Sequence, residues 1–202
     1  MTKTKIGIIE GYTGAVLQTI GTAVRELNEQ GYDVEVQARH QANEIEEGFW
    51  QWLKNDADAI FLYVNTGDER FDRIKETVSR VNAPVFSMQE ELSNVPIDVL
   101  AIAKQYHMQG GLENTKNLLR FMAQYCGKME AAVPPPEELP WQGIYHPGAN
   151  RLFESLNDYN AWYNDKKRGK HTVGLLLFRS AWLEGDTAMW NAVIKEFEGR
   201  GT

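Results

Sequence analysis

Over the first 95 residues, short apolar runs alternate with stretches in which apolar residues recur at every third or fourth position. The short runs predict β-strands, and the recurring positions predict helices that bury one face. Four strands are expected, at residues 6–9, 34–36, 59–64 and 83–88. The run at residues 59–64 is apolar almost throughout, which is typical of a central parallel strand covered on both faces.

Three helices are expected between these strands. Their apolar positions lie at residues 16–27, 45–53 and 71–81, and Gly31 ends the first helix. Strands that alternate with helices in this way predict an α/β fold, in which a parallel sheet of Rossmann or flavodoxin type carries flanking helices. The crossovers of such a sheet are right-handed. Residues 1–95 are therefore expected to form an N-terminal α/β domain.

The pattern changes in the middle of the chain. Residues 96–133 are predicted to be a helical segment, which the double glycine at residues 110–111 interrupts. Asn114 or Thr115 could cap the second helix of this segment. Prolines then make residues 134–150 a stiff, extended linker, and this linker is the expected domain boundary.

Residues 151–202 are predicted to be the start of a second α/β domain. The pattern indicates a helix that includes Trp162, a strand of the buried type at residues 173–178 and a helix at residues 188–199. A lone strand and helix cannot bury their apolar faces without more sheet. We therefore expect either that the chain is the front part of something longer or that its last unit joins the first sheet.

Composition excludes several classes of protein. The formal net charge of the 202 residues is −7, which argues against a nucleic-acid or anionic-membrane surface, because both need a basic patch. Cys126 is the only cysteine, so neither an intrachain disulfide nor a thiolate metal cluster can form. No apolar stretch approaches the ~18 residues of a membrane span, and no signal-peptide pattern precedes the first strand. A cytoplasmic protein is expected.

Two histidines are candidates for chemistry. His146 stands in the sequence Gly-Ile-Tyr-His-Pro at residues 143–147, where the following proline holds its backbone extended. An imidazole fixed in this way could ligate a metal or shuttle a proton, or it could bond to backbone and lock the linker. His107 could complete a metal-transit pair with His146, or interact with a helix dipole. Trp141, in the linker, could touch a ligand ring.

Several short segments follow one another in a fixed order from Tyr106 to the C-terminus. They are Gly-Gly-x-Glu-Asn at residues 110–114, the proline-rich linker, Gly-Ile-Tyr-His-Pro at 143–147, Tyr-Asn-Ala-Trp-Tyr at 159–163, Val-Gly-Leu-Leu at 173–176, Arg-Ser-x-Trp at 179–182 and Glu-Gly-Arg-Gly at 198–201. In this order they resemble the large (H) subunit of the cobaltochelatase and magnesium-chelatase family, which inserts a metal into a tetrapyrrole. The resemblance is to the N-terminal portion of that subunit.

The resemblance implies a tetrapyrrole-binding subunit of an ATP-dependent metal chelatase, whose AAA-type ATPase partner subunits use the ATP. Divalent cobalt or magnesium is then a substrate: insertion of cobalt into a corrinoid precursor is favoured, and insertion of magnesium into protoporphyrin is the alternative. No bound cofactor is implied, and this chain alone is expected to be inactive. His146 becomes the candidate for catalysis and metal binding, and Tyr145 and Arg179 join Trp141 as candidates for substrate binding. Imidazole suits transition metals better than magnesium, so contact between His146 and the metal would favour cobalt.

Two other classes stay open. The chain could be a non-catalytic α/β module that binds a tetrapyrrole or docks partner subunits. It could also be a flavodoxin-like protein that binds FMN, although the loop at residues 11–14 is not the Ser/Thr-rich phosphate cradle expected of one. The same loop has neither the G-x-G-x-x-G pattern nor the lysine of a phosphate-binding P-loop.

Overall fold

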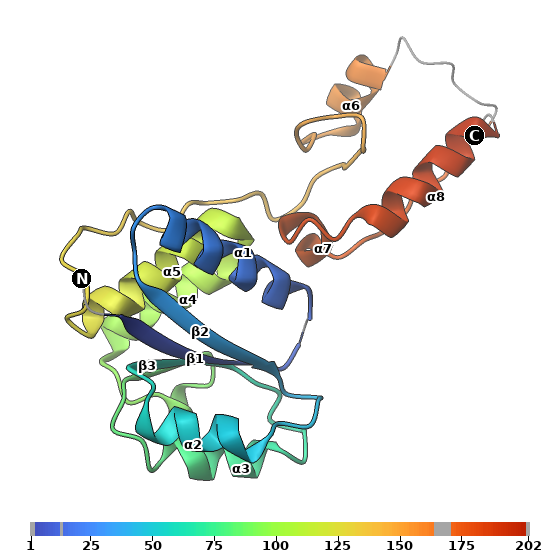
Figure 1. The fold of residues 1–202 in the computed structure, drawn as a ribbon. Helices are drawn as coiled ribbons and strands as arrows, with labels where there is room; N and C mark the ends of the chain where they lie inside the picture. Colours follow the sequence, from blue (N-terminus) through green and yellow to red (C-terminus); the bar gives the residue numbers. More distant parts are fainter. Residues whose placement is uncertain (1–2, 13, 164–170, 201–202) are drawn as a thin grey trace. The chain divides into compact units, whose positions relative to one another are not determined.

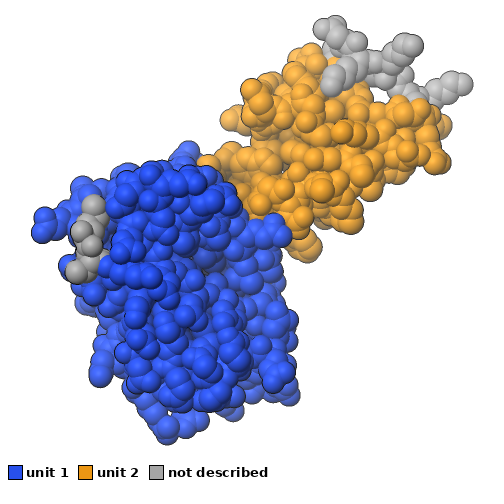
Figure 2. Space-filling model, viewed as in Figure 1, with its two compact units in different colours: residues 1–138 blue, residues 139–202 orange. Residues whose placement is uncertain are grey.

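The computed structural model describes residues 3–12, 14–163 and 171–200. The chain divides into two compact units, residues 1–138 and residues 139–202, which Figure 2 shows in different colours. The division falls inside the proline-rich segment at residues 134–150. Each unit has a fold of its own.

Unit 1 is built on a four-stranded sheet. Its strands are β1 (Thr4–Glu10), β2 (Val34–His40), β3 (Ala59–Tyr63) and β4 (Val85–Ser87), in the order β2-β1-β3-β4. Every pairing is parallel, and Ile6 of β1 lies opposite Val36 on one side and Ala59 on the other. The predicted α/β fold is confirmed, with the strand order of a flavodoxin-like sheet.

Helices cover both faces of this sheet. They are α1 (Ala15–Glu29), α2 (Glu47–Asn55), α3 (Phe71–Val78), α4 (Ile97–Gln109) and α5 (Gly111–Tyr125), with a short 3-10 turn, η1 (Glu90–Leu92). In Figure 1, α1, α4 and α5 lie on one face of the sheet, and α2 and α3 lie on the other. Among the described residues, no helix is both long enough and apolar enough to cross a membrane.

Two clusters of buried side chains result, one on each face of the sheet. Side chains of β3 alternate between them: Ala59 and Phe61 belong to the cluster under α1, α4 and α5, and Ile60 and Leu62 to the cluster under α2 and α3. Successive side chains of a strand point to opposite faces, so a strand with helices on both sides needs an unbroken apolar run. The run predicted at residues 59–64 is this strand.

The turn between α4 and α5 consists of glycines in a backbone conformation that other residues rarely adopt. Gly110 has a φ of +69° and Gly111 a φ of +77°. The predicted caps were wrong, because α5 already begins at Gly111 and both Asn114 and Thr115 lie inside it. Asn114 instead bonds to the backbone of Glu137, donating at 2.9 Å and accepting at 2.8 Å. It therefore ties the proline-rich segment to α5.

Unit 2 contains α6 (Leu156–Tyr163), α7 (Arg179–Leu183) and α8 (Ala188–Gly199), and one antiparallel bridge joins Ile144 to Phe153. The prediction of a strand at residues 173–178 was wrong, because these residues are not paired with another strand. The side chains of Leu176 and Phe178 are 95% and 85% exposed. A strand is defined by its hydrogen bonds to a neighbour, and the described part of unit 2 offers it no sheet.

His107 lies in the last turn of α4. The centroid of its ring is 5.0 Å from that of Phe61 and 4.7 Å from that of Tyr63. Desolvation disfavours the charged imidazole in this setting and lowers the pKa of His107 to about 4. The ring is therefore neutral at neutral pH, and it packs against the aromatic rings of Phe61 and Tyr63.

We expect the stability of unit 1 to fall as the pH drops from 6.5 to 4. Over this range the unfolded chain takes up a proton on His107 and the folded chain does not, which costs the folded state up to about 3 kcal/mol at pH 4. His107→Phe should therefore flatten the pH dependence of the free energy of unfolding between these pH values. An NMR titration that placed the His107 ring near its ordinary pKa would contradict this.

Candidate functional site

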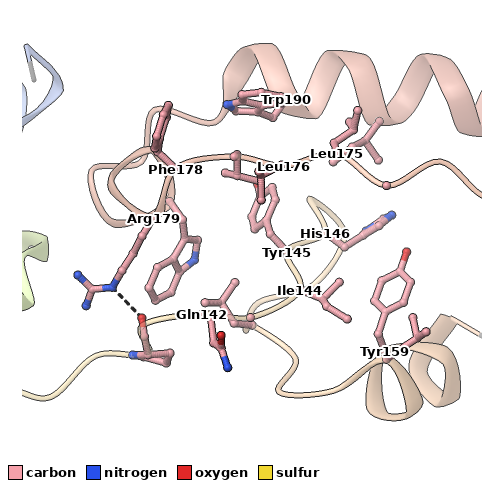
Figure 3. Close-up of a pocket in the computed structure, with 18 of the residues that line it drawn as sticks. Gln142, Ile144, Tyr145, His146, Tyr159, Leu175, Leu176, Phe178, Arg179 and Trp190 are labelled. Atoms are coloured by element: carbon pink, nitrogen blue, oxygen red, sulfur yellow. Dashed lines mark hydrogen bonds between the residues drawn. The ribbon is translucent and has the colours of Figure 1, made fainter.

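Unit 2 contains a cavity of about 560 Å³ whose walls are mostly apolar. The loop at residues 140–146 forms one wall (Figure 3). The extended segment at residues 172–178 and residues of helices α6, α7 and α8 form the others. Aromatic rings line it at several points, among them Trp141, Tyr145 and Trp190. The structure thus brings four sequence-predicted site residues, Trp141, Tyr145, His146 and Arg179, to the lining of one cavity.

Arg179, the first residue of α7, holds the start of unit 2 in place. Its Nε donates to the carbonyl of Pro140 at 2.8 Å (Figure 3). Its Nη2 donates to the carbonyl of Leu139 at 3.2 Å. Its guanidinium lies 4.4 Å from the ring centroid of Trp141. Burial lowers the pKa of Arg179 from its ordinary value. The side chain therefore fixes the position of Trp141 and places a positive charge at this end of the cavity.

Tyr145 reaches from the loop to α8. Its hydroxyl donates to Oδ1 of Asn191 at 2.7 Å, while its ring lines the cavity. Asn191 also donates, at 3.3 Å, to the hydroxyl of Thr187, the residue immediately before α8 begins. The loop is thereby joined to the first half of α8.

His146 is buried, and both of its ring nitrogens are engaged. Nδ1 accepts the backbone N–H of Gly148 at 3.0 Å, and Nε2 lies 3.2 Å from Oε1 of Glu198. A neutral imidazole that accepts at Nδ1 carries its proton on Nε2, so Nε2 donates to Glu198. A metal-bound histidine also donates its second N–H, but its other nitrogen gives its lone pair to the metal. In His146 that lone pair, on Nδ1, accepts the N–H of Gly148 instead. This geometry is that of a residue that locks the loop, which is one of the two roles the sequence left open.

Catalysis and metal binding by His146 therefore stay predictions, as does metal binding by His107. The two histidines belong to different units, and His107 is packed against Phe61 and Tyr63 in unit 1. In the part of the chain that the structure describes, no three His, Cys, Asp or Glu side chains are grouped so that they could hold a metal ion.

Glu198, in the last turn of α8, is a residue of this site that the sequence did not single out. Its Oε1 accepts the hydroxyl of Tyr163, on α6, at 2.6 Å, in addition to the N–H of His146. The hydrogen bond to this carboxylate raises the pKa of Tyr163 to about 12. The only signal in the sequence was the place of Glu198 in the Glu-Gly-Arg-Gly segment at residues 198–201.

The ring of His146 is enclosed by aromatic side chains of α6. The centroids of Trp162 and Tyr163 lie 5.1 Å and 5.5 Å from its own, and that of Tyr159 lies 6.1 Å away. A second cavity, of about 190 Å³, shares several lining residues with the first, among them His146, Tyr159 and Ile194. His146 therefore stands in the wall between two cavities, one mostly apolar and the other lined in part by Glu198 and Tyr163.

The residues that form this site match a known protein family. The family model described as CobN/Magnesium Chelatase matches residues 104–202, which include all of unit 2 and helix α5. The chain is thus similar to this family over nearly half of its length, residues 104–202. Its relatives include the chloroplastic magnesium-chelatase subunit ChlH of Oryza sativa subsp. japonica, with 30% identity over 112 residues, and the aerobic cobaltochelatase subunit CobN of Pseudomonas aeruginosa, with 32% identity over 97 residues.

The chain spans only a small part of these relatives. The matched regions cover 50% and 48% of this chain but 8% and 7% of the subunits from Oryza sativa and Pseudomonas aeruginosa. The solved catalytic subunit of cobaltochelatase from Mycobacterium tuberculosis has a similar fold, with a TM-score of 0.56 and 16% identity. That likeness covers 99% of this chain and 16% of the solved chain. Both units thus correspond to a fold that occurs within a much longer chelatase subunit.

We expect Tyr163 to ionise near pH 12 in the folded chain, because the phenolate would stand against the carboxylate of Glu198. The raised pKa stabilises the folded state fully below pH 10, and this contribution is lost between pH 10 and 12. A titration followed by tyrosinate absorbance should lose its step near pH 12 in Tyr163→Phe. Glu198→Gln should move that step toward pH 10, since it removes the neighbouring charge. If the step persists in Tyr163→Phe, the assignment is wrong.

Proposed function

We propose that this chain is part of the large, tetrapyrrole-binding subunit of an ATP-dependent metal chelatase, and that the cavity of unit 2 binds the macrocycle. The observation that carries the proposal is the cavity itself. Its volume of about 560 Å³ lies within the range of cavities that hold cofactor-sized molecules. A flat, conjugated macrocycle gains most from walls of aromatic and aliphatic side chains, and these are the walls the cavity has.

The charges around the cavity suit the edge of such a ligand. Tetrapyrroles carry carboxylates on the rim of the ring, and these need a cation or hydrogen-bond donors. Arg179 is the cationic side chain in the lining, and it lies at the end of the cavity where Trp141 is held. We therefore expect the macrocycle to place its apolar face against Trp190 and Tyr145 and its rim toward Arg179.

We infer that the inserted metal is cobalt or magnesium, because one matching relative is a magnesium-chelatase subunit and another is a cobaltochelatase subunit. Insertion requires the pyrrole nitrogens to lose protons while a divalent ion sheds water. The preference for cobalt depends on His146 as a ligand of the ion. This role requires either that Nδ1 give up the N–H of Gly148 or that Nε2 lose its proton. The energy would come from AAA-type ATPase partner subunits.

A second candidate is a module that binds the macrocycle without catalysing insertion. The hydrogen bonds of His146 favour it, because Nδ1 accepts from Gly148 and Nε2 faces Glu198. In this case the base and the metal ligands would lie elsewhere in a full-length subunit, and unit 2 would supply the binding cavity.

The direct test is a titration of the purified chain with metal-free protoporphyrin, followed by tryptophan quenching and by the Soret band. We expect saturable binding, which Trp190→Ala should weaken by about threefold to tenfold because a ring that stacks on the macrocycle is lost. Met189→Ala is the matched control. It truncates a neighbouring side chain of α8 that is 62% exposed and does not line the cavity.

Two results would count against the proposal. Absence of saturable binding by the unmodified chain would show that the macrocycle is bound elsewhere. Equal binding by Trp190→Ala and Met189→Ala would show that the cavity of unit 2 is not the binding site.

A further inference from the structure

One carboxylate oxygen joins three segments of unit 2. Oε1 of Glu198 accepts the Nε2–H of His146 at 3.2 Å and the hydroxyl of Tyr163 at 2.6 Å. Glu198 belongs to α8, Tyr163 to α6, and His146 to the loop that forms one wall of the larger cavity. The partners are separated from Glu198 by 52 and 35 residues along the chain.

Apolar burial does little to hold these segments together. Helices α6, α7 and α8 have no buried residue, and among the described residues of unit 2 only His146 and Phe153 are buried. Where apolar burial is small, the hydrogen bonds of buried polar groups fix the arrangement, because leaving such a group without a partner is costly. In unit 2 the buried polar group is His146, and its partner on another helix is Glu198.

The place of His146 links this contact to the cavity. His146, Tyr159 and Ile194 line both cavities of unit 2, so movement of the imidazole would change the larger one. The backbone of the loop is fixed as well, because Nδ1 of His146 holds the N–H of Gly148. If the imidazole lost its partner on α8, the ring and the loop could turn away together.

We propose that Glu198 is a positioning residue, which holds His146 and its loop as a wall of the macrocycle cavity by accepting hydrogen bonds. It acts neither as a base nor as a ligand of the metal. This inference rests on the proposed function of the cavity. It assigns to Glu198 a role that depends on an acceptor oxygen and not on negative charge.

Replacement by glutamine separates these two properties. The amide oxygen of Glu198→Gln can still accept from His146 and Tyr163, whereas Glu198→Ala offers no acceptor. We expect Glu198→Gln to bind protoporphyrin as the unmodified chain does, and Glu198→Ala to bind it at least about tenfold more weakly. The control is Glu196→Ala, on the same helix, whose carboxylate bonds only to Arg200 among the contacts described and is exposed. It should bind like the unmodified chain.

A second measurement needs no ligand. The backbone N–H of Gly148 donates to Nδ1 of His146, so its hydrogen exchange reports whether the ring is held. We expect slow exchange at Gly148 in the unmodified chain, Glu198→Gln and Glu196→Ala, and exchange at least about tenfold faster in Glu198→Ala. Far-UV circular dichroism shows whether α6 and α8 remain folded. If Glu198→Ala unfolds these helices, the protoporphyrin binding and the Gly148 exchange of Glu198→Gln decide whether the role of Glu198 depends on an acceptor oxygen or on charge.

The outcomes are distinct. Loss of binding and of Gly148 protection in Glu198→Gln would overturn the inference, because the charge would then be required. Protection and binding that survive in Glu198→Ala would overturn it as well. If the unmodified chain binds no protoporphyrin, the proposed function fails, and the exchange of Gly148 in the three variants still decides whether Glu198 holds the loop.

Discussion

Unit 2 depends on hydrogen bonds between distant segments to keep its cavity open. A cavity of about 560 Å³ in a unit of this size leaves little apolar surface that the helices can bury against one another. Polar contacts at two ends compensate. Arg179 binds the carbonyls that lead into the loop, and Glu198 binds the imidazole near the end of the same loop. Between them, Tyr145 joins the loop to α8.

Unit 1 obeys a different constraint. Its parallel sheet is covered on both faces, so the side chains of β1 and β3 are divided between two apolar clusters, and the fold follows from burial. Two polar side chains of unit 1 stabilise its structure: Asn114 ties the proline-rich segment to α5, and the neutral ring of His107 packs against Phe61 and Tyr63. The two units thus differ in what holds them together, and the candidate site lies in the one with less burial.

This difference explains what could be predicted from the sequence. The strands and helices of unit 1 were predicted because each is set by a local period of apolar residues, and the run at residues 59–64 also indicated its central place. The segment at residues 173–178 has the same local pattern of apolar residues and was predicted to be a strand. A strand needs a neighbouring strand to pair with, and the sequence of the segment does not show whether such a neighbour is present.

The candidate site shows a similar limit. Its residues were found by their type and by a resemblance, and four of them, Trp141, Tyr145, His146 and Arg179, do line one cavity. Their contacts could not be found in this way. The tautomer of His146 is set by Gly148 and by Glu198, and the second of these lies 52 residues away. Sequence reasoning therefore located the wall of the cavity and missed the carboxylate that holds it.

The most direct test of this account is the coupling free energy between His146 and Glu198. A double-mutant cycle with His146→Ala, Glu198→Ala and the double variant, followed by the tryptophan fluorescence of urea unfolding, isolates that term. The account predicts a coupling of about 1 to 3 kcal/mol in favour of the folded state, because Glu198→Ala leaves a buried imidazole without its acceptor and His146→Ala removes the donor to Glu198. A coupling close to zero would mean that the two residues do not hold unit 2 together, and it would contradict the account.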